Sequence, residues 1–188
     1  MALSEGLTVA CTDENRRGGI KKLWIAERDL VDSFAPVVGA HEYDNVLMMD
    51  GGGSGSPSVT DFFYLYEFED FTGNMTSEGN AENGSKVLNR TLEFHIPKMT
   101  KEHAKALQEV FVSCRVIIVY EDFNDLFFVA GYDELLEKKS ALIATVSEMT
   151  GTALQDQNGY TLSFAGVGGE LLREFTGLTT ADPFKQTP

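Results

Sequence analysis

The stretch NGSKVLNRTLEFHIP, residues 83–97, decides the fold class of this chain. Its first two residues, Asn83-Gly84, predict a two-residue hairpin turn, because both tolerate the positive φ that a type I′ turn requires. From Lys86 to Ile96 the side chains alternate between apolar and polar, which is the period of a strand with one buried face. Arg90 interrupts the apolar side, and Pro97 ends the strand because it has no N–H to donate. A tight turn into a half-buried strand indicates an antiparallel sheet.

Patterns on both sides of this stretch predict more strands and one helix. Thr100 is a good N-cap, and the apolar spacing over Lys101–Ser113 is helical. In Thr60–Asp70 every second residue is aromatic, and we expect this stripe to lie in the core or at a subunit interface. The stripe consists of Phe62, Tyr64, Tyr66 and Phe68. Further strands are expected at Ile20–Ala26, Met75–Glu82, Arg115–Glu121, Leu126–Gly131, Leu135–Thr150 and Tyr160–Ala165. Together these patterns predict a mainly β (α+β) fold, an antiparallel β-sandwich or barrel with one flanking helix.

The length fits one domain with extended ends. A chain of 188 residues can bury a core of its own without a disulfide or a metal. We expect an N-terminal arm over residues 1–18, a single β domain over residues 19–166 and a C-terminal tail over residues 167–188. The stretch 50–58, DGGGSGSPS, has the composition of a flexible linker and is expected to be a loop between two strands.

The charge balance excludes some classes of partner. Asp and Glu number 29 against 15 Lys and Arg, which gives a formal charge of −14. A protein that grips nucleic-acid phosphates needs a basic face, and so does one that docks on an anionic membrane. We therefore expect neither specific DNA binding nor membrane association. Cys11 and Cys114 are expected to be reduced thiols, with Cys114 in the core, and no signal peptide or membrane-spanning segment is expected.

No motif for catalysis, for a cofactor or for a metal stands out. The three histidines, His41, His95 and His103, have no second His or Cys at ligand spacing. The stretch Gly79–Lys86 looks like a phosphate-binding loop, but its Ser and Lys stand in reversed order and a strand follows instead of a helix. We therefore expect a protein that is not an enzyme and that has no cofactor and no metal.

One acidic segment is a candidate functional surface. Between Asp61 and Glu82 there are six carboxylates and no Lys or Arg. They permit three interpretations: a solvated strand face, an electrostatic surface with a purpose, or a carboxylate pair like that of glycoside hydrolases. The six residues are Asp61, Glu67, Glu69, Asp70, Glu78 and Glu82.

Several segments, taken in order, carry a resemblance to a known family. They are GGIKKLWIA at 18–26, the acidic aromatic strand Tyr64–Phe71, Glu82-Asn83-Gly84 leading into Leu92–Lys98, the helix, the hairpin Val116–Gly131 and GTALQDQNGYTLSF at 151–164. Over residues 18–166 the chain resembles the tail-tube structural proteins of tailed bacteriophages, in particular those of phages of Bacteroidetes hosts. The Gly/Ser loop and the C-terminal tail depart from the family pattern.

The resemblance implies a virion protein without a catalytic site. Tail-tube domains assemble into rings, usually hexameric, whose inner strands join into one barrel, and loops and terminal arms bind the next ring. The implied partners are further copies of the chain and other virion proteins, with DNA only in transit. The implied location is the virion tail, assembled in the host cytoplasm. The six carboxylates then become candidates for a lumen or ring interface that repels phosphate. The candidate inter-subunit loop consists of Gly51, Gly52, Gly53, Ser54, Gly55 and Ser56.

Two other functions stay open at this point. A neck, hub or head-associated virion protein would share the fold and differ in its place in the particle. A small acidic β-domain hydrolase would belong to a different class. Electron microscopy of the purified protein discriminates between the three, because it would show stacked rings, isolated rings or uniform monomers.

Overall fold

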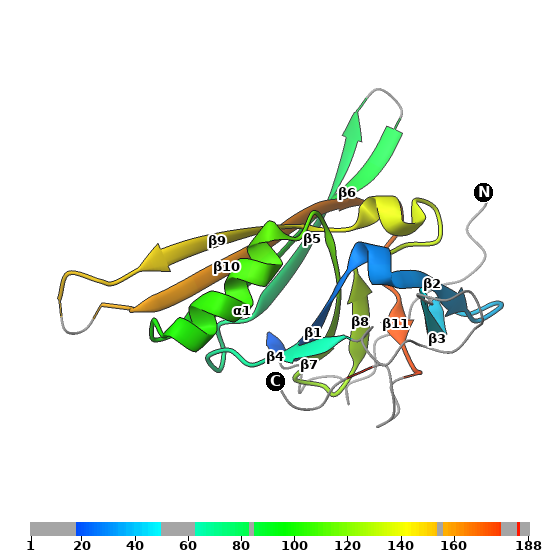
Figure 1. Cartoon of the computed structure of the whole chain (residues 1–188). Coiled ribbons are helices and arrows are strands. Elements are labelled where there is room, and N and C mark those ends of the chain that lie inside the picture. Colours follow the sequence, from blue (N-terminus) through cyan, green and yellow to red (C-terminus); the bar gives the residue numbers. More distant parts are fainter. Residues whose placement is uncertain (1–17, 50–62, 83–84, 154–155, 178–183, 185–188) are drawn as a thin grey trace.

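The computed structural model of the chain describes residues 18–49, 63–82, 85–153, 156–177 and 184. Within these residues the protein is mainly β, with eleven strands in two sheets and one α-helix (Figure 1). This confirms the predicted β-rich fold with a single helix. The helix α1 covers Lys101–Val112, and two short 3-10 helices are η2 (Arg28–Leu30) and η3 (Glu137–Ser140). The strands are β1 (Ile20–Glu27), β2 (Val31–Pro36), β3 (Glu42–Met48), β4 (Tyr64–Tyr66), β5 (Asn74–Glu82), β6 (Ser85–Pro97), β7 (Val116–Asp122), β8 (Phe127–Ala130), β9 (Ile143–Met149), β10 (Gly159–Gly168) and β11 (Glu174–Phe175).

The smaller sheet has the strand order β5-β6-β10-β9, and all its neighbouring strands are antiparallel. Glu82 of β5 pairs with Ser85 of β6, so two residues connect these strands, as the Asn83-Gly84 signal predicts. In Figure 1 the β9–β10 hairpin extends well beyond the rest of the molecule, and the β5–β6 hairpin projects in another direction. The smaller sheet therefore carries two long hairpins that leave the core.

The larger sheet has the strand order β2-β3-β11-β8-β7-β1-β4. The short strand β11 lies between β3 and β8 and runs parallel to β3, with Phe175 opposite Tyr43. Phe175 is only 1% exposed, because aromatic side chains of the core surround it. The prediction of a C-terminal tail that begins at residue 167 is therefore wrong for residues 167–175. Strand β10 runs to Gly168, and residues 174–175 form an inner strand of the larger sheet.

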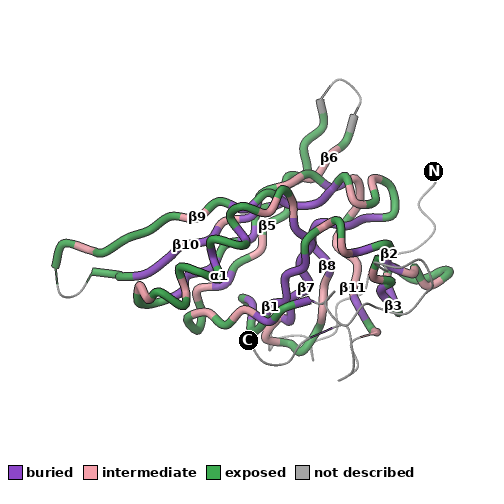
Figure 2. The backbone as a smooth tube through the Cα atoms, in the orientation of Figure 1, coloured by how far each residue is buried: buried purple, intermediate pink, exposed green. Residues whose placement is uncertain are grey.

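Two hydrophobic clusters hold the fold together, one on each face of the larger sheet. The first joins this sheet to the smaller sheet and to the helix, through buried side chains such as Ile118, Phe94 and Leu107. The second lies on the opposite face and contains Trp24. Strand β7 is consequently buried on both sides, as Figure 2 shows, and its run Val116–Tyr120 is apolar or aromatic at every position instead of alternating.

The helix forms where the sequence predicts it. The Thr100 side chain accepts a hydrogen bond from the backbone N–H of His103 at 3.1 Å, which confirms the predicted N-cap. Leu107 and Val110 of α1 are buried in the first cluster. Cys114, expected in the core, is instead exposed, because it lies just beyond the end of the helix and before β7 begins.

The aromatic stripe expected in Thr60–Asp70 forms only in part. In the described residues a strand covers Tyr64–Tyr66 alone, and it pairs only with β1 at the edge of the larger sheet. Phe63 and Leu65 are buried, whereas Tyr64 is 39% exposed, so Tyr64 does not lie in the core and its place at a subunit interface stays a prediction. Periodicity predicts the alternation but not the side, because neighbouring elements cover both faces here. The other stripe residues are Tyr66 and Phe68, which pack against the first cluster, and Phe62, which lies outside the described residues.

The connection between β4 and β5 contains a strained residue. The N–H of Thr72 donates to the carbonyl of Glu69 at 3.2 Å, which closes a four-residue turn, and Phe71 in this turn has a φ of 64°. A left-handed backbone costs an ordinary residue about 1–2 kcal/mol, and glycine is the usual choice at such a turn position. The Phe71 ring is nevertheless 82% exposed and stacks on Phe123 of the β7–β8 turn, with ring centroids 5.3 Å apart. An exposed aromatic ring on a strained backbone, stacked on the partly exposed Phe123, thus lies at one end of the larger sheet.

Candidate functional site

One broad surface of the molecule is a sheet face that no described helix or strand covers. The cross-strand register of the smaller sheet places alternate residues of its four strands on the side away from the core. Their side chains are exposed or partly exposed. We call this surface the outer sheet face. It comprises Asn74, Thr76, Glu78 and Asn80 of β5, Asn89, Thr91 and Glu93 of β6, Thr161, Ser163, Ala165 and Val167 of β10, and Ile143, Thr145, Ser147 and Met149 of β9.

The outer sheet face is polar, weakly acidic and free of cations. Among the residues that define it, only Glu78 and Glu93 are charged, and most of the others are Thr, Ser or Asn. Part of their hydrogen-bonding capacity is used within the sheet, since the Thr145 hydroxyl donates to the carbonyl of Ser163 at 3.0 Å. Strong contacts to phosphate come from Lys and Arg. A nucleic acid would therefore meet repulsion and no cationic anchor on this face.

The structure separates the predicted acidic residues into two groups. Glu78 lies on the outer sheet face. Glu67, Glu69 and Asp70 are exposed too, but they lie in the connection between β4 and β5. The structure therefore does not bring all the predicted acids onto one strand face. Outside the described residues lie Asp61, the side chain of Glu82, and the loop candidates Gly51, Gly52, Gly53, Ser54, Gly55 and Ser56.

Glu69 reaches the border of the outer sheet face. Its carboxylate oxygen Oε2 lies 3.8 Å from Nε2 of His95 on β6, and the Thr72 hydroxyl donates to the Glu69 carbonyl at 2.6 Å. His95 is on the same side of β6 as Glu93 and is 6% exposed. The β4–β5 connection is thus attached at the end of this face, and only part of the predicted acidic surface lies on the face itself.

Glu93 is a residue of the site that the acidic segment alone does not reveal, because it lies beyond Glu82 in the sequence. The signal that identifies it is the alternation over Lys86–Ile96, which already puts Glu93 on the polar side of its strand. In the structure it pairs with Asn74 of β5 on one side and with Ser163 of β10 on the other. Glu93 therefore lies on a central strand of the smaller sheet, with its side chain on the outer sheet face.

The two edge strands of the smaller sheet, β5 and β9, each have one side that pairs with no other strand within the described residues. Strand β5 pairs only with β6, and β9 only with β10. They are nine and seven residues long. An open edge presents unpaired N–H and C=O groups that can accept a strand of another chain. Ile143 and Met149 on β9 are 48% and 47% exposed, so this edge also carries apolar surface.

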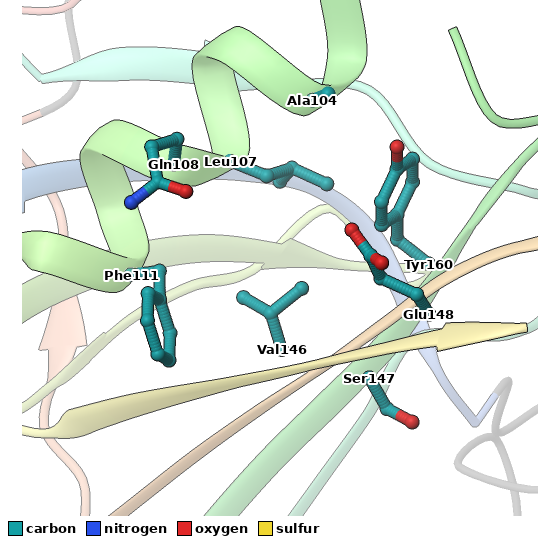
Figure 3. Close-up of a pocket in the computed structure, with 8 residues that line it drawn as sticks. All are labelled: Ala104, Leu107, Gln108, Phe111, Val146, Ser147, Glu148 and Tyr160. Atoms are coloured by element: carbon teal, nitrogen blue, oxygen red, sulfur yellow. The ribbon is translucent and has the colours of Figure 1, made fainter.

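A groove of about 460 Å³ runs between α1 and β9 (Figure 3). Leu107 and Val146 supply apolar surface inside it, and Phe111 of the helix is 54% exposed beside them. In Figure 3 Val146 and Glu148 point toward the helix, whereas Ser147 points away from it. Among the described residues that line the groove, Glu148 is the only charged one. A single carboxylate without a second one opposite does not make an acid–base pair, so the groove offers apolar surface rather than paired catalytic carboxylates.

A buried ionic cluster joins the two sheets. The side chain of Arg90 on β6 is fully buried, and its Nη1 lies 3.9 Å from Oδ2 of Asp133, which follows β8. The Nη2 of Arg90 donates to the carbonyl of Glu170, while Nε and Nη1 have no hydrogen-bond partner in the described part of the chain. Asp133 accepts hydrogen bonds from the N–H groups of Leu136 and Gly169 at 2.6 and 2.9 Å. Burial lowers the pKa of Arg90, and the nearby charge of Asp133 opposes this effect.

The same cluster fastens the connection that leads to β11. The Glu170 carboxylate accepts hydrogen bonds from the Arg173 guanidinium at 3.0 and 2.9 Å and from the N–H of Glu134 at 2.8 Å. Burial raises the pKa of Glu170, but these hydrogen bonds outweigh it and hold the pKa below its usual value. The Arg173 guanidinium also lies over the Tyr43 ring, 5.3 Å from its centroid. The cluster therefore has a structural role, which is to place β11 in the larger sheet.

Comparison with protein-family models, with curated proteins and with solved structures found no match for this chain. Among the residues that the structure describes, no three His, Cys, Asp or Glu side chains are placed to hold a metal ion. Over the same residues, no helix combines the length and the apolar character needed to cross a membrane. The outer sheet face and the open strand edges are therefore the features on which a functional inference can rest.

Proposed function

We propose that this chain is a structural subunit of a phage tail, which assembles with itself into rings that stack into a tube through which DNA passes. The proposal includes the finer fold, a β-sandwich of the tail-tube type in which the smaller sheet lines the tube. The observation that carries it is the outer sheet face, a broad uncovered surface with two carboxylates and no Lys or Arg. The resemblance over residues 18–166 supports the same function.

The strand order of the smaller sheet supports closure into a ring. Its strands alternate in direction along the order β5-β6-β10-β9, so β5 and β9 run in opposite directions. When copies are related by rotation about a common axis, β9 of one copy meets β5 of the next. The two strands are then antiparallel and can form a regular hydrogen-bonded ladder. A closed barrel of this kind leaves no open edge in the smaller sheet.

The ring order that the resemblance implies sets the size of the barrel. Six copies would contribute about 24 strands. With about 4.8 Å between strands and a strand tilt of about 40°, the barrel backbone would have a diameter of about 48 Å. Most residues of the outer sheet face have short side chains, so the greater part of this width would stay open.

The charge of the proposed lining suits passage of DNA rather than binding. Duplex DNA carries one negative charge per about 1.7 Å of its axis, and each Lys or Arg contact adds affinity through release of counterions. The outer sheet face offers no such contact, and Glu78 and Glu93 repel phosphate over a screening length of about 8 Å. The partners are then further copies of the chain and other virion proteins. The location is the virion tail, assembled in the host cytoplasm.

Electron microscopy of the purified full chain tests the proposed assembly. Tubes or stacked rings with an inner barrel about 48 Å wide are the expected result. Isolated rings at every concentration would favour a neck, hub or head-associated protein instead. Uniform monomers at every concentration would contradict self-assembly and would leave a small hydrolase as the better interpretation.

Charge reversal tests the lining separately from the assembly. The variant Glu78→Lys with Glu93→Lys makes the outer sheet face basic. The matched control, Glu102→Lys with Glu109→Lys, changes the charge equally on exposed positions of α1, on the other side of the smaller sheet. Only the first variant should retain DNA at low salt, with a log–log slope of binding constant against salt steeper than about −2. Equal retention by both variants would rule out the assigned lumen.

A further inference from the structure

We infer that the end of the larger sheet that carries Phe71 and Phe123 is the surface on which a second copy of this chain stacks, and that it meets the opposite end of that copy. The inference rests on the proposed function and deepens it. Ring closure through β5 and β9 supplies contacts within a ring. The Phe71–Phe123 end supplies the contact from one ring to the next.

The first observation is the exposed apolar surface at this end. The Phe71 ring is 82% exposed and stacks on Phe123 at an interplanar angle of 16°. Leu126, in the same β7–β8 turn as Phe123, is 40% exposed. Phe71 also has the left-handed backbone that favours glycine. Strain and exposure both oppose folding of an isolated chain, and a partner that covers the ring accounts for their presence together.

The surface is also firmly held. The N–H of Ile20 donates to the carbonyl of Gly73 at 3.1 Å, which ties the β4–β5 connection to β1. The Asp122 carboxylate accepts hydrogen bonds from the N–H groups of Asn124 and Leu126 at 2.8 and 2.9 Å, which fixes the β7–β8 turn. A surface that is already ordered loses little conformational entropy when a partner binds it.

The charge around the pair identifies the kind of partner. The two segments that form this end, residues 67–73 and 121–126, contain six carboxylates and no Lys or Arg. Lys21 of β1 forms ion pairs with two of them at 2.6 Å, so a clear excess of negative charge is left. The carboxylates belong to Glu67, Glu69, Asp70, Glu121, Asp122 and Asp125. A matching partner has to present cations around an apolar contact.

The opposite end of the same sheet carries charges of both signs. There β1 ends and β7 begins, and the N–H of Arg28 donates to the carbonyl of Arg115 at 3.0 Å. The helix η3 lies beside them, because Leu142 just after it bridges to Val116. Four of the chain's 15 Lys and Arg gather here, beside the four carboxylates of Glu27, Asp29, Asp32 and Glu137. Arg28 pairs with Asp29 at 2.9 Å and Lys138 with Asp32 at 4.0 Å, so this end is close to neutral, in contrast to the acidic end. The four cations are Arg28, Arg115, Lys138 and Lys139.

Head-to-tail stacking brings these two ends together. A head-to-head contact would instead place six carboxylates against six, which disfavours it strongly. A head-to-tail contact between unlike surfaces does not close on itself and so generates a filament. The acidic aromatic end of one copy therefore meets less repulsion at the opposite, near-neutral end of the next copy, which offers four cations, than at a second acidic end.

The variant Phe71→Gly tests this contact. It removes the ring and relieves the left-handed backbone, so it should fold and should unfold at a temperature no lower than the wild type. The matched control is Val38→Ser, which removes a fully exposed apolar side chain in the turn between β2 and β3. In sedimentation and electron microscopy we expect wild type and control to form tubes. Phe71→Gly should leave single rings, with stacking at least tenfold weaker.

Charge reversal then tests which end is the partner. Lys138→Glu with Lys139→Glu should shorten the tubes, because the end that meets the six carboxylates loses two of its four cations, and the loss should be largest at low salt. If Phe71→Gly stacks like the wild type, the inference is overturned while the proposed function stands. If it loses rings as well as tubes, the stacking assignment is wrong. If the wild type forms neither rings nor tubes at any concentration, the proposed function itself fails.

Discussion

Replacing Asp133 by Asn should destabilise the fold more than replacing Arg90 by Met, although the two residues face each other in one buried cluster. Asp133 is 1% exposed and accepts two backbone hydrogen bonds besides its contact with Arg90. Arg90 donates only to the Glu170 carbonyl, and two of its nitrogens have no partner among the described residues. Asp133→Asn therefore leaves a buried cation, whereas Arg90→Met leaves a carboxylate that keeps its two backbone hydrogen bonds.

The expected difference is about 3 kcal/mol. Asp133→Asn takes from the buried Arg90 charge its ion-pair partner, which costs about 3–5 kcal/mol, and one backbone N–H loses its acceptor for about 1 kcal/mol more. Arg90→Met removes a desolvated cation, while Asp133 keeps both backbone donors, so the net cost should be about 1–2 kcal/mol. The free energy of unfolding of a domain is only about 5–15 kcal/mol, so Asp133→Asn should bring the protein close to unfolding.

Urea unfolding of the monomeric protein measures this difference. The fluorescence of Trp24, the only Trp in the chain and 1% exposed, reports on the core. The double variant Arg90→Met with Asp133→Asn should be more stable, by at least about 2 kcal/mol, than the sum of the single changes predicts. Equal losses for the two single variants, or a larger loss for Arg90→Met, would refute the reasoning.

Three other positions give further tests. Gly168→Ala should cost about 1–3 kcal/mol in thermal unfolding, because a Cβ there would overlap the Arg90 guanidinium. Thr100→Ala should cost about 1 kcal/mol, whereas Thr100→Ser should keep most of the cap, as urea midpoints would show. The pKa of Glu170 is lowered in the folded state, so its stabilising contribution is present above the usual glutamate pKa of about 4.3 and is lost as pH falls through the folded value. Glu170→Gln should therefore make acid unfolding shallower below about pH 4.3, and an unchanged acid profile would contradict this.

Local signals explain what the sequence could predict of the fold. Asn83-Gly84, the alternation over Lys86–Ile96 and the Thr100 cap each depend on neighbours within a few residues. The structure confirms the pairing of β5 with β6, the cap and, except at the buried His95, the alternation. Strand β11 depends on distant partners instead. Its two residues have no period to detect, its backbone pairs with β3 and β8, and Phe175 is buried by aromatic side chains that are distant in sequence, such as Phe34. Tertiary packing therefore decides this element, and no local pattern could have predicted it.

The candidate site was predictable only in part for the same reason. The acidic segment predicts Glu78, but the strand register is needed to combine it with Glu93 and with the polar residues of β9 and β10. Arg90 interrupts the apolar face of its strand in the sequence. The structure gives the reason, which is that Asp133 and the Glu170 carbonyl meet its guanidinium inside the fold. Those partners lie far along the chain, beyond the reach of any periodicity.

The place of β11 has a consequence for how the chain is made. Among the described strands of the larger sheet, the β2–β3 hairpin is joined to the others only through β11. Phe175 is synthesised about 127 residues after Met48. At about 5–20 residues per second, roughly 6–25 seconds therefore pass between synthesis of the β2–β3 hairpin and synthesis of β11. During that time the Phe34 ring, which packs against Phe175 in the finished protein, lacks this neighbour. A nascent chain that stops before residue 174 therefore lacks the strand that joins β3 to β8, and its larger sheet stays incomplete.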